Sequence, residues 1–390
     1  MGSSLPAAAR PTTAIAQWQF WQFALPIVML FGGMVVRYLA YVSIVQQPSA
    51  SGYVAATCIW DCYWYGDIAL HGYQAYPEQL NFGGPAGIAN WAFFPLYPLV
   101  IGLLARLTLL GPATLGAIVS PLLTLVAGLL SWPLFKGDRR AYLLFAALLL
   151  VGPFSFYFSI LYSESLFLCL TVLAFVLLAR RNYPAAGVAG ALLSATRIVG
   201  VLFVFSMLAE AYGQHREKGG SLGSFPRAVL GRPDLIFGML FAPVGFFAFT
   251  VLLHRVTGDA LAFVHIQRAW DRMLGNPIGY LVTAFTTPGA PGRDEGLLGV
   301  AALAGFALSG VLAFKGRVPA ALFCGLILLL SLTNGVESMV RFVAALAPLG
   351  IVLCQLLARW RPLFFLSLLL FVVLDFEWTI GWIHQRGALM

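Results

Sequence analysis

The stretch ESLFLCLTVLAFVLLARR, residues 164–181, decides the fold. It begins with an acidic residue, continues as an uncharged apolar run to residue 179, and ends with two arginines. Similar apolar stretches recur between residues 20 and 384, separated by charges and by Gly or Pro residues. Such runs predict membrane-spanning helices and are unlike the alternating pattern of a β-barrel. The sequence therefore predicts an all-α, polytopic membrane protein.

The composition agrees with this class. The chain has 390 residues, of which 60% are hydrophobic and 10% charged, with a mean hydropathy of +0.87. Soluble domains carry about 25% charged residues. We expect one helical bundle over residues 1–390. We interpret the net charge of +8 as an orientation signal, and the absence of a long basic run argues against a nucleic-acid partner.

The apolar stretches predict 11 to 13 membrane crossings, after a loose tail at residues 1–16. They lie near 18–45, 93–110, 113–135, 139–160, 164–179, 184–210, 234–257, 294–314, 317–333, 341–358 and 362–383. The stretch 184–210 is expected to break at residues 194–200, with Arg197 near the far side. The region before Lys136 predicts either a re-entrant piece or breaks near Gly111 and Pro121.

Basic clusters set the expected orientation. They lie in loops that the positive-inside rule assigns to the cytoplasm, at 180–181, 215–232, 315–317 and 359–361. Four segments then share the opposite face: the first extracytoplasmic loop 46–91, the turn 158–165, the second extracytoplasmic loop 258–293 and the turn 334–338. Ionisable groups at membrane depth persist where they are buried in protein or line a wet cavity. We therefore expect the functional site where these segments meet.

The segment CIWDCYWYGDIALHGY (58–73) is the most informative part of the first loop. As a helix it would lie at the interface, with its acids facing water. Alternatively, Asp61 is a base in a partly apolar pocket, where it could accept a proton from a hydroxyl. Asp67 could play either part. Cys58 and Cys62 could form a disulfide in an oxidising compartment, but isolated thiols are the simpler interpretation.

Other polar residues also allow two interpretations. Glu164 is either part of a helix start capped by Ser163 or Ser165, or a second acid in the cavity. His265 and Arg268 are three residues apart on an expected surface helix and could bind one anion. Arg341 either snorkels to lipid headgroups or binds a lipid phosphate.

The usual motifs of soluble enzymes are absent from the sequence. It contains no phosphate-binding loop, HExxH, GxSxG or close His/Cys cluster. A nucleotide or nucleotide sugar therefore has no recognisable site. If the protein uses a donor, we expect the membrane to supply it.

Several motifs together resemble one known family. WDCYWYGDIALHGY, AFFPLYP, FYFSILYSESLF and ATRIVGVL occur in the order and spacing of the PIG-V mannosyltransferase family, followed by GDALAFVHIQRAW and SMVRF. That family belongs to the GT-C superfamily of polyprenol-dependent glycosyltransferases. The resemblance covers roughly residues 20–360. It implies a GT-C bundle of about a dozen spans, with amphipathic juxtamembrane helices in its extracytoplasmic loops.

The resemblance also implies an activity. The chain would move mannose or a related hexose from a polyprenyl-phosphate carrier to a lipid or glycolipid acceptor, with inversion and with Asp61 as general base. On the acceptor side we expect Trp60, Tyr65, Asp67, His71 and Glu164. The candidates for the donor phosphate are Arg341, Arg268, His265 and Arg197. We expect no cofactor and no metal, and membrane lipids as further partners.

The composition suggests a bacterial inner-membrane protein with its site on the periplasmic or extracellular face. Bacteria make no GPI anchors, so the acceptor stays open. The segment 76–90 is additional to the family pattern and is expected to shape the acceptor site. The alternative function is a transporter or lipid flippase with a polar cavity, which broken helices and buried arginines also fit. The sequence contains no internal repeat of the kind that transporters often have.

Overall fold

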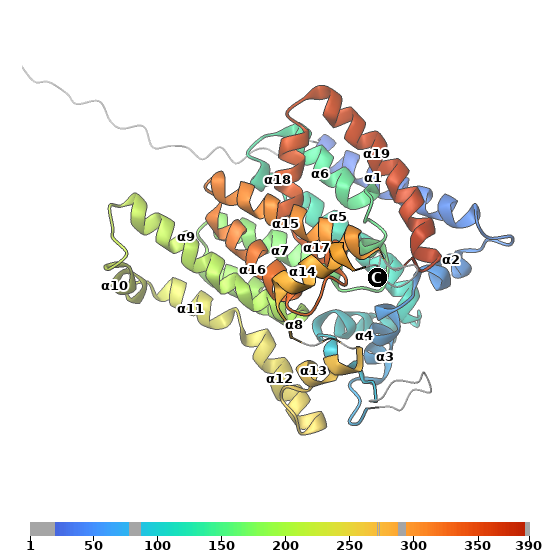
Figure 1. Ribbon diagram of the computed structural model, residues 1–390, viewed down its shortest axis with the longest axis horizontal. Coiled ribbons are helices and arrows are strands. Elements are labelled where there is room, and N and C mark those ends of the chain that lie inside the picture. The colour runs from blue at the N-terminus through green and yellow to red at the C-terminus, as the bar shows by residue number, and fades with distance from the viewer. Residues whose placement is uncertain (1–19, 78–86, 271, 273, 288–293, 387–390) are drawn as a thin grey trace, which may run out of the picture.

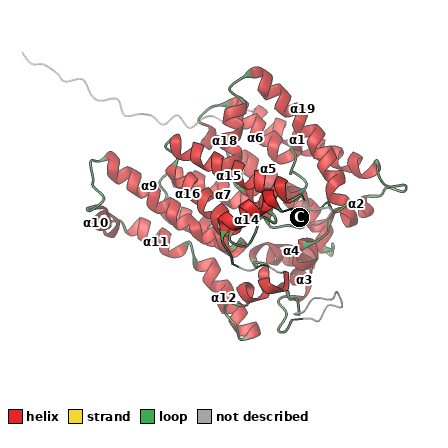
Figure 2. Cartoon of the chain, viewed as in Figure 1, coloured by secondary structure: helices red, strands yellow, loops and turns green. Residues whose placement is uncertain are grey.

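The computed structural model describes residues 20–77, 87–270, 272, 274–287 and 294–386. The expected tail at 1–16, the middle of the additional segment at 78–86 and the end of the second loop at 288–293 lie outside the described residues. Within the described part of the chain, every regular element is a helix (Figures 1 and 2). The all-α prediction is confirmed.

Six helical segments are long and apolar enough to cross a membrane. They are α1 (Phe20–Val42), α5 (Pro112–Leu130), η4 with α9 (Ile198–Glu217), α11 with α12 (Pro233–Thr257), α15 (Glu295–Phe314) and α19 (Arg361–Ile383). A seventh is formed if α17 (Met339–Ala345) and α18 (Ala347–Leu357), which meet at a bend of 77°, count as one span. The protein is therefore an integral, multi-pass membrane protein.

Among the described residues, the helices that are long enough to span a membrane number six or seven, fewer than the 11 to 13 predicted crossings. Several predicted stretches instead form helices of 10–17 residues, shorter than the roughly 20 residues that one crossing needs. These shorter apolar helices are α4 (Leu96–Thr108), α7 (Glu164–Ala179), α14 (Pro277–Thr286) and α16 (Val318–Leu332).

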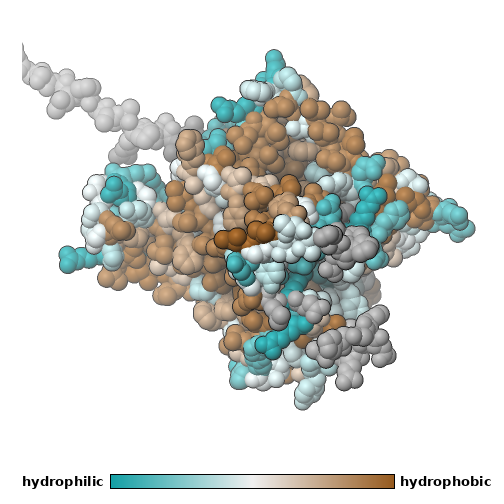
Figure 3. Space-filling model, viewed as in Figure 1, coloured by the Kyte–Doolittle hydropathy of each residue, from teal (hydrophilic) through white to brown (hydrophobic). Residues whose placement is uncertain are grey.

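The remaining elements connect or flank these helices. They are α2 (Ala50–Thr57), α3 (Asp61–His71), η1 (Asn90–Ala92), η2 (Trp132–Phe135), α6 (Arg139–Val151), η3 (Tyr157–Ser159), α8 (Tyr183–Thr196), α10 (Phe225–Leu230), α13 (Ala262–His265) and η5 (Ile266–Trp270). In the view of Figure 3, hydrophobic residues cover most of the surface from α9 on the left to α19 on the upper right. Hydrophilic residues gather near α10 on the left and near α13 at the bottom. This surface suits a bundle surrounded by lipid.

Two of the predicted breaks are present. Helix α8 ends at Thr196, and η4 begins at Ile198, so Arg197 lies at the break. Helix α4 ends at Thr108, and α5 begins at Pro112 after Gly111. The break considered at Pro121 is wrong, because Pro121 lies inside α5.

Small residues bring α8 and α11 into backbone contact. A Cβ added to Gly187 would lie 2.5 Å from Cα of Gly238, and one added to Gly238 would lie 2.4 Å from the carbonyl oxygen of Tyr183. Glycine at both positions lets the two backbones touch, as is common where membrane helices associate. This contact fixes α8, and with it the break that carries Arg197.

An irregular segment, residues 152–163, passes through the core between α6 and α7. Its carbonyl groups find partners on α5: the Ser120 hydroxyl donates to the Ile160 carbonyl at 2.7 Å, and Thr124 donates to the Phe158 carbonyl at 3.3 Å. Non-helical backbone survives at membrane depth only when its polar groups are satisfied inside the protein. The segment delivers Tyr162, Ser163 and Glu164 to the site.

A buried ion pair joins α1 to α19. Arg37 Nη1 donates to Asp375 Oδ2 at 3.1 Å, and the two side chains are 1% and 0% exposed. Ser155 connects both partners, because its hydroxyl accepts from Arg37 Nη1 at 2.5 Å and donates to Asp375 Oδ1 at 2.7 Å. The irregular segment is therefore anchored at its start.

Candidate active site

Asp61 and Arg341, 280 positions apart, form the central contact of the site. Arg341 Nη1 donates to Asp61 Oδ2 at 2.5 Å. Asp61 is the first residue of α3, and Arg341 lies in the first turn of α17. The Arg341 side chain is 8% exposed, so it does not snorkel to headgroups. The interpretation of Arg341 as an interfacial residue is thus wrong, and its role toward a donor phosphate stays a prediction.

Glu164 extends this contact into a chain of alternating charges. Its Oε1 lies 3.1 Å from Arg341 Nε and accepts a hydrogen bond from Arg197 Nη1 at 3.0 Å. The order Asp61, Arg341, Glu164, Arg197 is formally neutral. Glu164 is 1% exposed, and its Oε2 has no hydrogen-bond partner in the described part of the chain. A buried charge needs an opposite charge beside it, and Arg341 and Arg197 supply that charge for Glu164.

Capping is therefore not what holds Glu164. Ser163 precedes α7 without a side-chain capping bond, because its hydroxyl accepts a 2.7 Å hydrogen bond from Tyr65. Burial raises the pKa of Tyr65, which keeps this hydroxyl protonated and able to donate. Glu164 is the first residue of α7, as one interpretation expected, and it is a buried acid that contacts Arg341; its role in a cavity stays a prediction.

The backbone before Asp61 is held in an unusual conformation. Trp60 has φ 56° and ψ −114°, a region that L residues rarely adopt. The Tyr162 hydroxyl bridges the residues on either side, donating to the Ile59 carbonyl at 3.0 Å and accepting from the Asp61 N–H at 3.2 Å. Such conformations persist where the surroundings over-determine them, often at functional sites.

Cys58 and Cys62 form a disulfide in the structure. The preferred expectation of isolated thiols is therefore wrong. Helix α2 ends just before Cys58, and Cys62 lies on the buried face of the first turn of α3, which brings the two sulfurs together across Trp60. The disulfide and Tyr162 thus constrain the same short loop, and both fix the position of Asp61.

Asp61 is the accessible member of the charge chain. Its side chain is 28% exposed, whereas Glu164 and Arg341 are buried. Arg341 occupies Oδ2, and within the described residues no hydrogen bond engages Oδ1. Trp60 beside it is 42% exposed. A partly exposed carboxylate with one oxygen held by an arginine can accept a proton from a bound hydroxyl on the other.

Asp67 and His71 lie farther along α3 and serve the loop. His71 Nδ1 lies 3.0 Å from Asp67 Oδ1, and Asn90 Nδ2 donates to Asp67 Oδ2 at 2.8 Å. Asn90 also donates to the Gly72 carbonyl at 3.0 Å. These contacts join the two ends of the loop between α3 and η1. The acceptor-side roles expected for Asp67 and His71 stay predictions.

His265 and Arg268 are not in contact with Asp61. His265 Nδ1 lies 2.6 Å from Asp259 Oδ2, and this hydrogen bond lowers the pKa of Asp259. Arg268 is exposed. A neighbouring ring does reach the first loop: Trp270 packs edge-on against Trp64 with centroids 5.9 Å apart.

All four segments expected to share one face therefore meet in space. Asp61 comes from the first loop, Glu164 from the turn 158–165, Trp270 from the second loop, and Arg341 follows the turn 334–338. The Gly275 N–H also donates to the Thr333 carbonyl at 2.8 Å, which joins the second loop to the end of α16.

Sequence reasoning gave no role to two residues of this site. Burial lowers the pKa of Arg272, and the carboxylates of Asp61 and Glu337 oppose that shift, so Arg272 lies within their electrostatic reach. Its position four residues after Arg268 in the second loop was the available signal. Nothing in the sequence indicates the role of Tyr162, except that it lies two residues before Glu164. Groups of three or more metal-ligating side chains are absent from the described ranges.

No protein-family model matches the chain, and no curated protein matches it.

Proposed function

We propose that the chain is an inverting glycosyltransferase of the GT-C type. It moves mannose or a related hexose from a polyprenyl-phosphate carrier to a lipid-linked acceptor, on the extracytoplasmic face of a bacterial inner membrane. The motif resemblance favours this family, and the all-helical, multi-pass architecture is compatible with it. The substrates are amphiphiles that the membrane supplies.

One observation carries the proposal: Asp61 is a partly exposed carboxylate at the end of a charge chain whose next two members, Arg341 and Glu164, are buried. Neutral pairing accounts for Glu164, Arg341 and Arg197 without a substrate. It does not account for the open Oδ1 of Asp61 beside exposed aromatic side chains. A general base for a sugar-accepting hydroxyl has these properties.

The reaction is a single displacement. The acceptor hydroxyl oxygen forms a bond to C1 of the sugar from the face opposite the carrier phosphate. The C1–O bond to the phosphate breaks, and its electron pair leaves with the prenyl monophosphate. Asp61 takes the proton of the hydroxyl. General-base catalysis of this kind typically raises the reaction rate about 10²- to 10⁴-fold.

The leaving phosphate needs cations. Arg341 is already paired with Asp61 and Glu164, Arg197 with Glu164, and His265 with Asp259. We therefore assign Arg341 chiefly to holding Asp61. Arg268 and Arg272, on the second loop, are the better candidates for the phosphate, because neither forms an ion pair within the described residues and Arg268 is exposed.

Transfer from a defined donor tests the proposal. Purified protein in liposomes is given radiolabelled polyprenyl-phosphate-mannose and a membrane lipid extract, and labelled glycolipid is measured. Asp61→Asn should lower transfer at least about 100-fold. The matched control is Glu217→Gln, which neutralises an exposed acid at the end of α9 and should leave transfer intact.

Two results would overturn the proposal. If Asp61→Asn folds and transfers sugar at the normal rate, Asp61 is not the base. If the carrier is never consumed while a solute or lipid crosses the liposome membrane, the protein is a transporter or flippase.

A further inference from the structure

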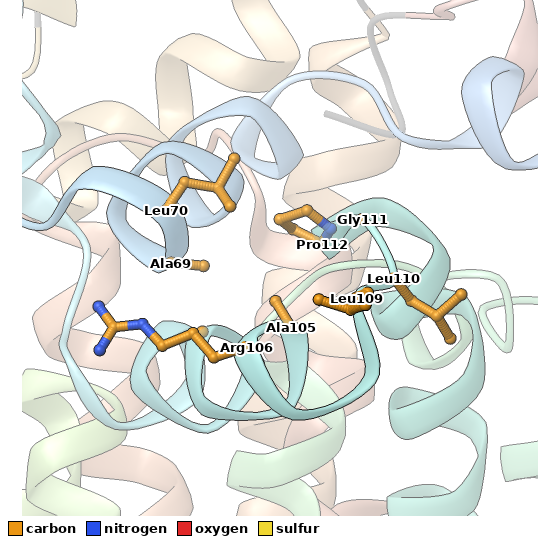
Figure 4. Close-up of a pocket in the computed structure, with 9 residues that line it drawn as sticks. Ala69, Leu70, Ala105, Arg106, Leu109, Leu110, Gly111 and Pro112 are labelled. Atoms are coloured by element: carbon orange, nitrogen blue, oxygen red, sulfur yellow. The ribbon is translucent and has the colours of Figure 1, made fainter.

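A groove lies between α3, α4 and the start of α5 (Figure 4). Its volume is about 380 Å³. Apart from one arginine, its lining is apolar or small: Ala69, Leu70, Gly102, Ala105, Arg106, Leu109, Leu110, Gly111 and Pro112. None of these residues belongs to the charge chain around Asp61.

Backbone contact fixes the floor of the groove. A Cβ added to Gly102 would lie 2.5 Å from the carbonyl oxygen of Ala69, so α4 touches α3 at this point. A Cβ on Gly66 would lie 3.9 Å from Cβ of Pro112, which brings the start of α5 against α3 as well. A groove whose floor is backbone keeps its shape better than a gap between flexible side chains.

The surface beside the groove is apolar and exposed. Leu99, Leu103 and Leu107 are four residues apart, share one face of α4 and are exposed. Leu109 and Leu110 continue this apolar surface into the turn before α5. On a multi-pass membrane protein, an exposed apolar helix face of this kind contacts acyl chains. Acyl chains are therefore the nearest candidates to enter the groove.

Arg106 gives the groove a polar end. It lies in the last turn of α4, is exposed, and makes no hydrogen bond or ion pair within the described residues. Figure 4 shows its guanidinium at one end of the gap and Leu110 at the other. Arginine binds phosphate oxygens through two parallel N–H donors. The groove is thus shaped for an amphiphile with a phosphate at one end.

We propose that this groove binds a membrane phospholipid of net negative charge. Its phosphate pairs with Arg106, and one acyl chain lies along Leu70, Leu109 and Leu110. Ala69 follows Asp61 by eight residues, about 12 Å along a helix. The site is therefore distinct from Asp61, and the proposal does not rest on the proposed function.

Native mass spectrometry of the delipidated full chain tests the site. The probes are phosphatidylglycerol, which is anionic, and phosphatidylcholine, which is zwitterionic. Phosphatidylglycerol should bind about tenfold more tightly, because the choline ammonium opposes the arginine. Arg106→Ala should remove that preference, and Arg106→Lys should keep part of it. Ala105→Phe should weaken both lipids by filling the groove.

Two controls make the result decisive. Arg255→Ala removes another exposed arginine from the last turn of a helix, α12, and should change nothing. Glu217→Gln should bind lipid normally. Equal binding of both lipids, an unchanged preference in Arg106→Ala, or displacement of phosphatidylglycerol by millimolar inorganic phosphate would each overturn the proposal.

Discussion

Trp382 packs edge-on against Tyr162, with ring centroids 5.8 Å apart, and its Nε1 donates to the Thr57 carbonyl at 2.8 Å. Thr57 is the last residue of α2 and directly precedes Cys58. Trp382 is 1% exposed, so the end of α19 supports both the loop that precedes Asp61 and the tyrosine that holds it. The most C-terminal span thus contributes to the position of the candidate base.

Tyr162→Phe should reduce transfer without abolishing it. The change removes the hydroxyl that bridges Ile59 and Asp61. The Ile59 carbonyl keeps its bond from the Cys62 N–H, but the Asp61 N–H loses its partner, a loss of about 1–3 kcal/mol. We expect kcat to fall about tenfold or more while donor KM stays near its original value. The control is Tyr142→Phe, which removes a 3.0 Å bond to the Gln22 carbonyl elsewhere in the core. Equal kcat for both variants would contradict a positioning role for Tyr162.

Glu164→Gln should lower kcat more strongly. The amide no longer balances Arg341 and Arg197, so Arg341 is freer to shift and Asp61 with it. We expect a loss of about 10- to 100-fold, the effect of about 1.4–2.8 kcal/mol. Steady-state kinetics with varied donor and acceptor measure it. An acceptor KM that rises while kcat is unchanged would place Glu164 in substrate binding instead.

The Arg37–Asp375 pair should govern stability. Asp375→Ala leaves Arg37 as an uncompensated buried charge, which destabilises by about 3–5 kcal/mol. The double variant Arg37→Met/Asp375→Leu removes both charges and should recover most of that loss. Thermal unfolding in detergent compares the two. If the double variant is no more stable than the single one, the charge of Arg37 is not the source of the destabilisation.

Thiol labelling should distinguish two classes of cysteine. The chain has five cysteines, and in the structure Cys169, Cys324 and Cys354 are free. Protein unfolded without reductant should take up three alkyl groups, and protein reduced first should take up five. Intact mass measures both. Five groups before reduction would show that Cys58 and Cys62 are not bonded in the isolated protein.

The fold class was predictable because apolar runs and Gly or Pro breaks are local signals. The runs identified the helical segments, and the breaks at Gly111 and Arg197 were visible in the sequence. Pro121 misled because a proline inside a membrane helix is tolerated where neighbouring polar groups satisfy the backbone. The number of crossings stays a prediction, because several apolar runs form helices of 10–17 residues, too short to count as spans by length.

The site was predictable only in outline. The positive-inside rule predicted that four segments share one side of the membrane, and these segments meet around Asp61. Arg341 was a candidate because it lies where a predicted span begins. The pairing of Arg341 with two acids was not foreseeable, because spacing carries no information across 280 positions. The pairing of His265 with Asp259 was equally hidden, although both lie in one short segment.

The long sequence separation of the buried ion pairs has a consequence for synthesis. A ribosome that has completed α7 has already made Arg37, Asp61 and Glu164, but not the three residues that pair with them, which are Arg197, Arg341 and Asp375. Until those later helices enter the membrane, the nascent chain holds unpaired charges within an apolar environment. Assembly of the site therefore belongs to the last stage of biogenesis, and a chain stopped before α17 should be recognised as unfinished by the quality-control proteases of the membrane.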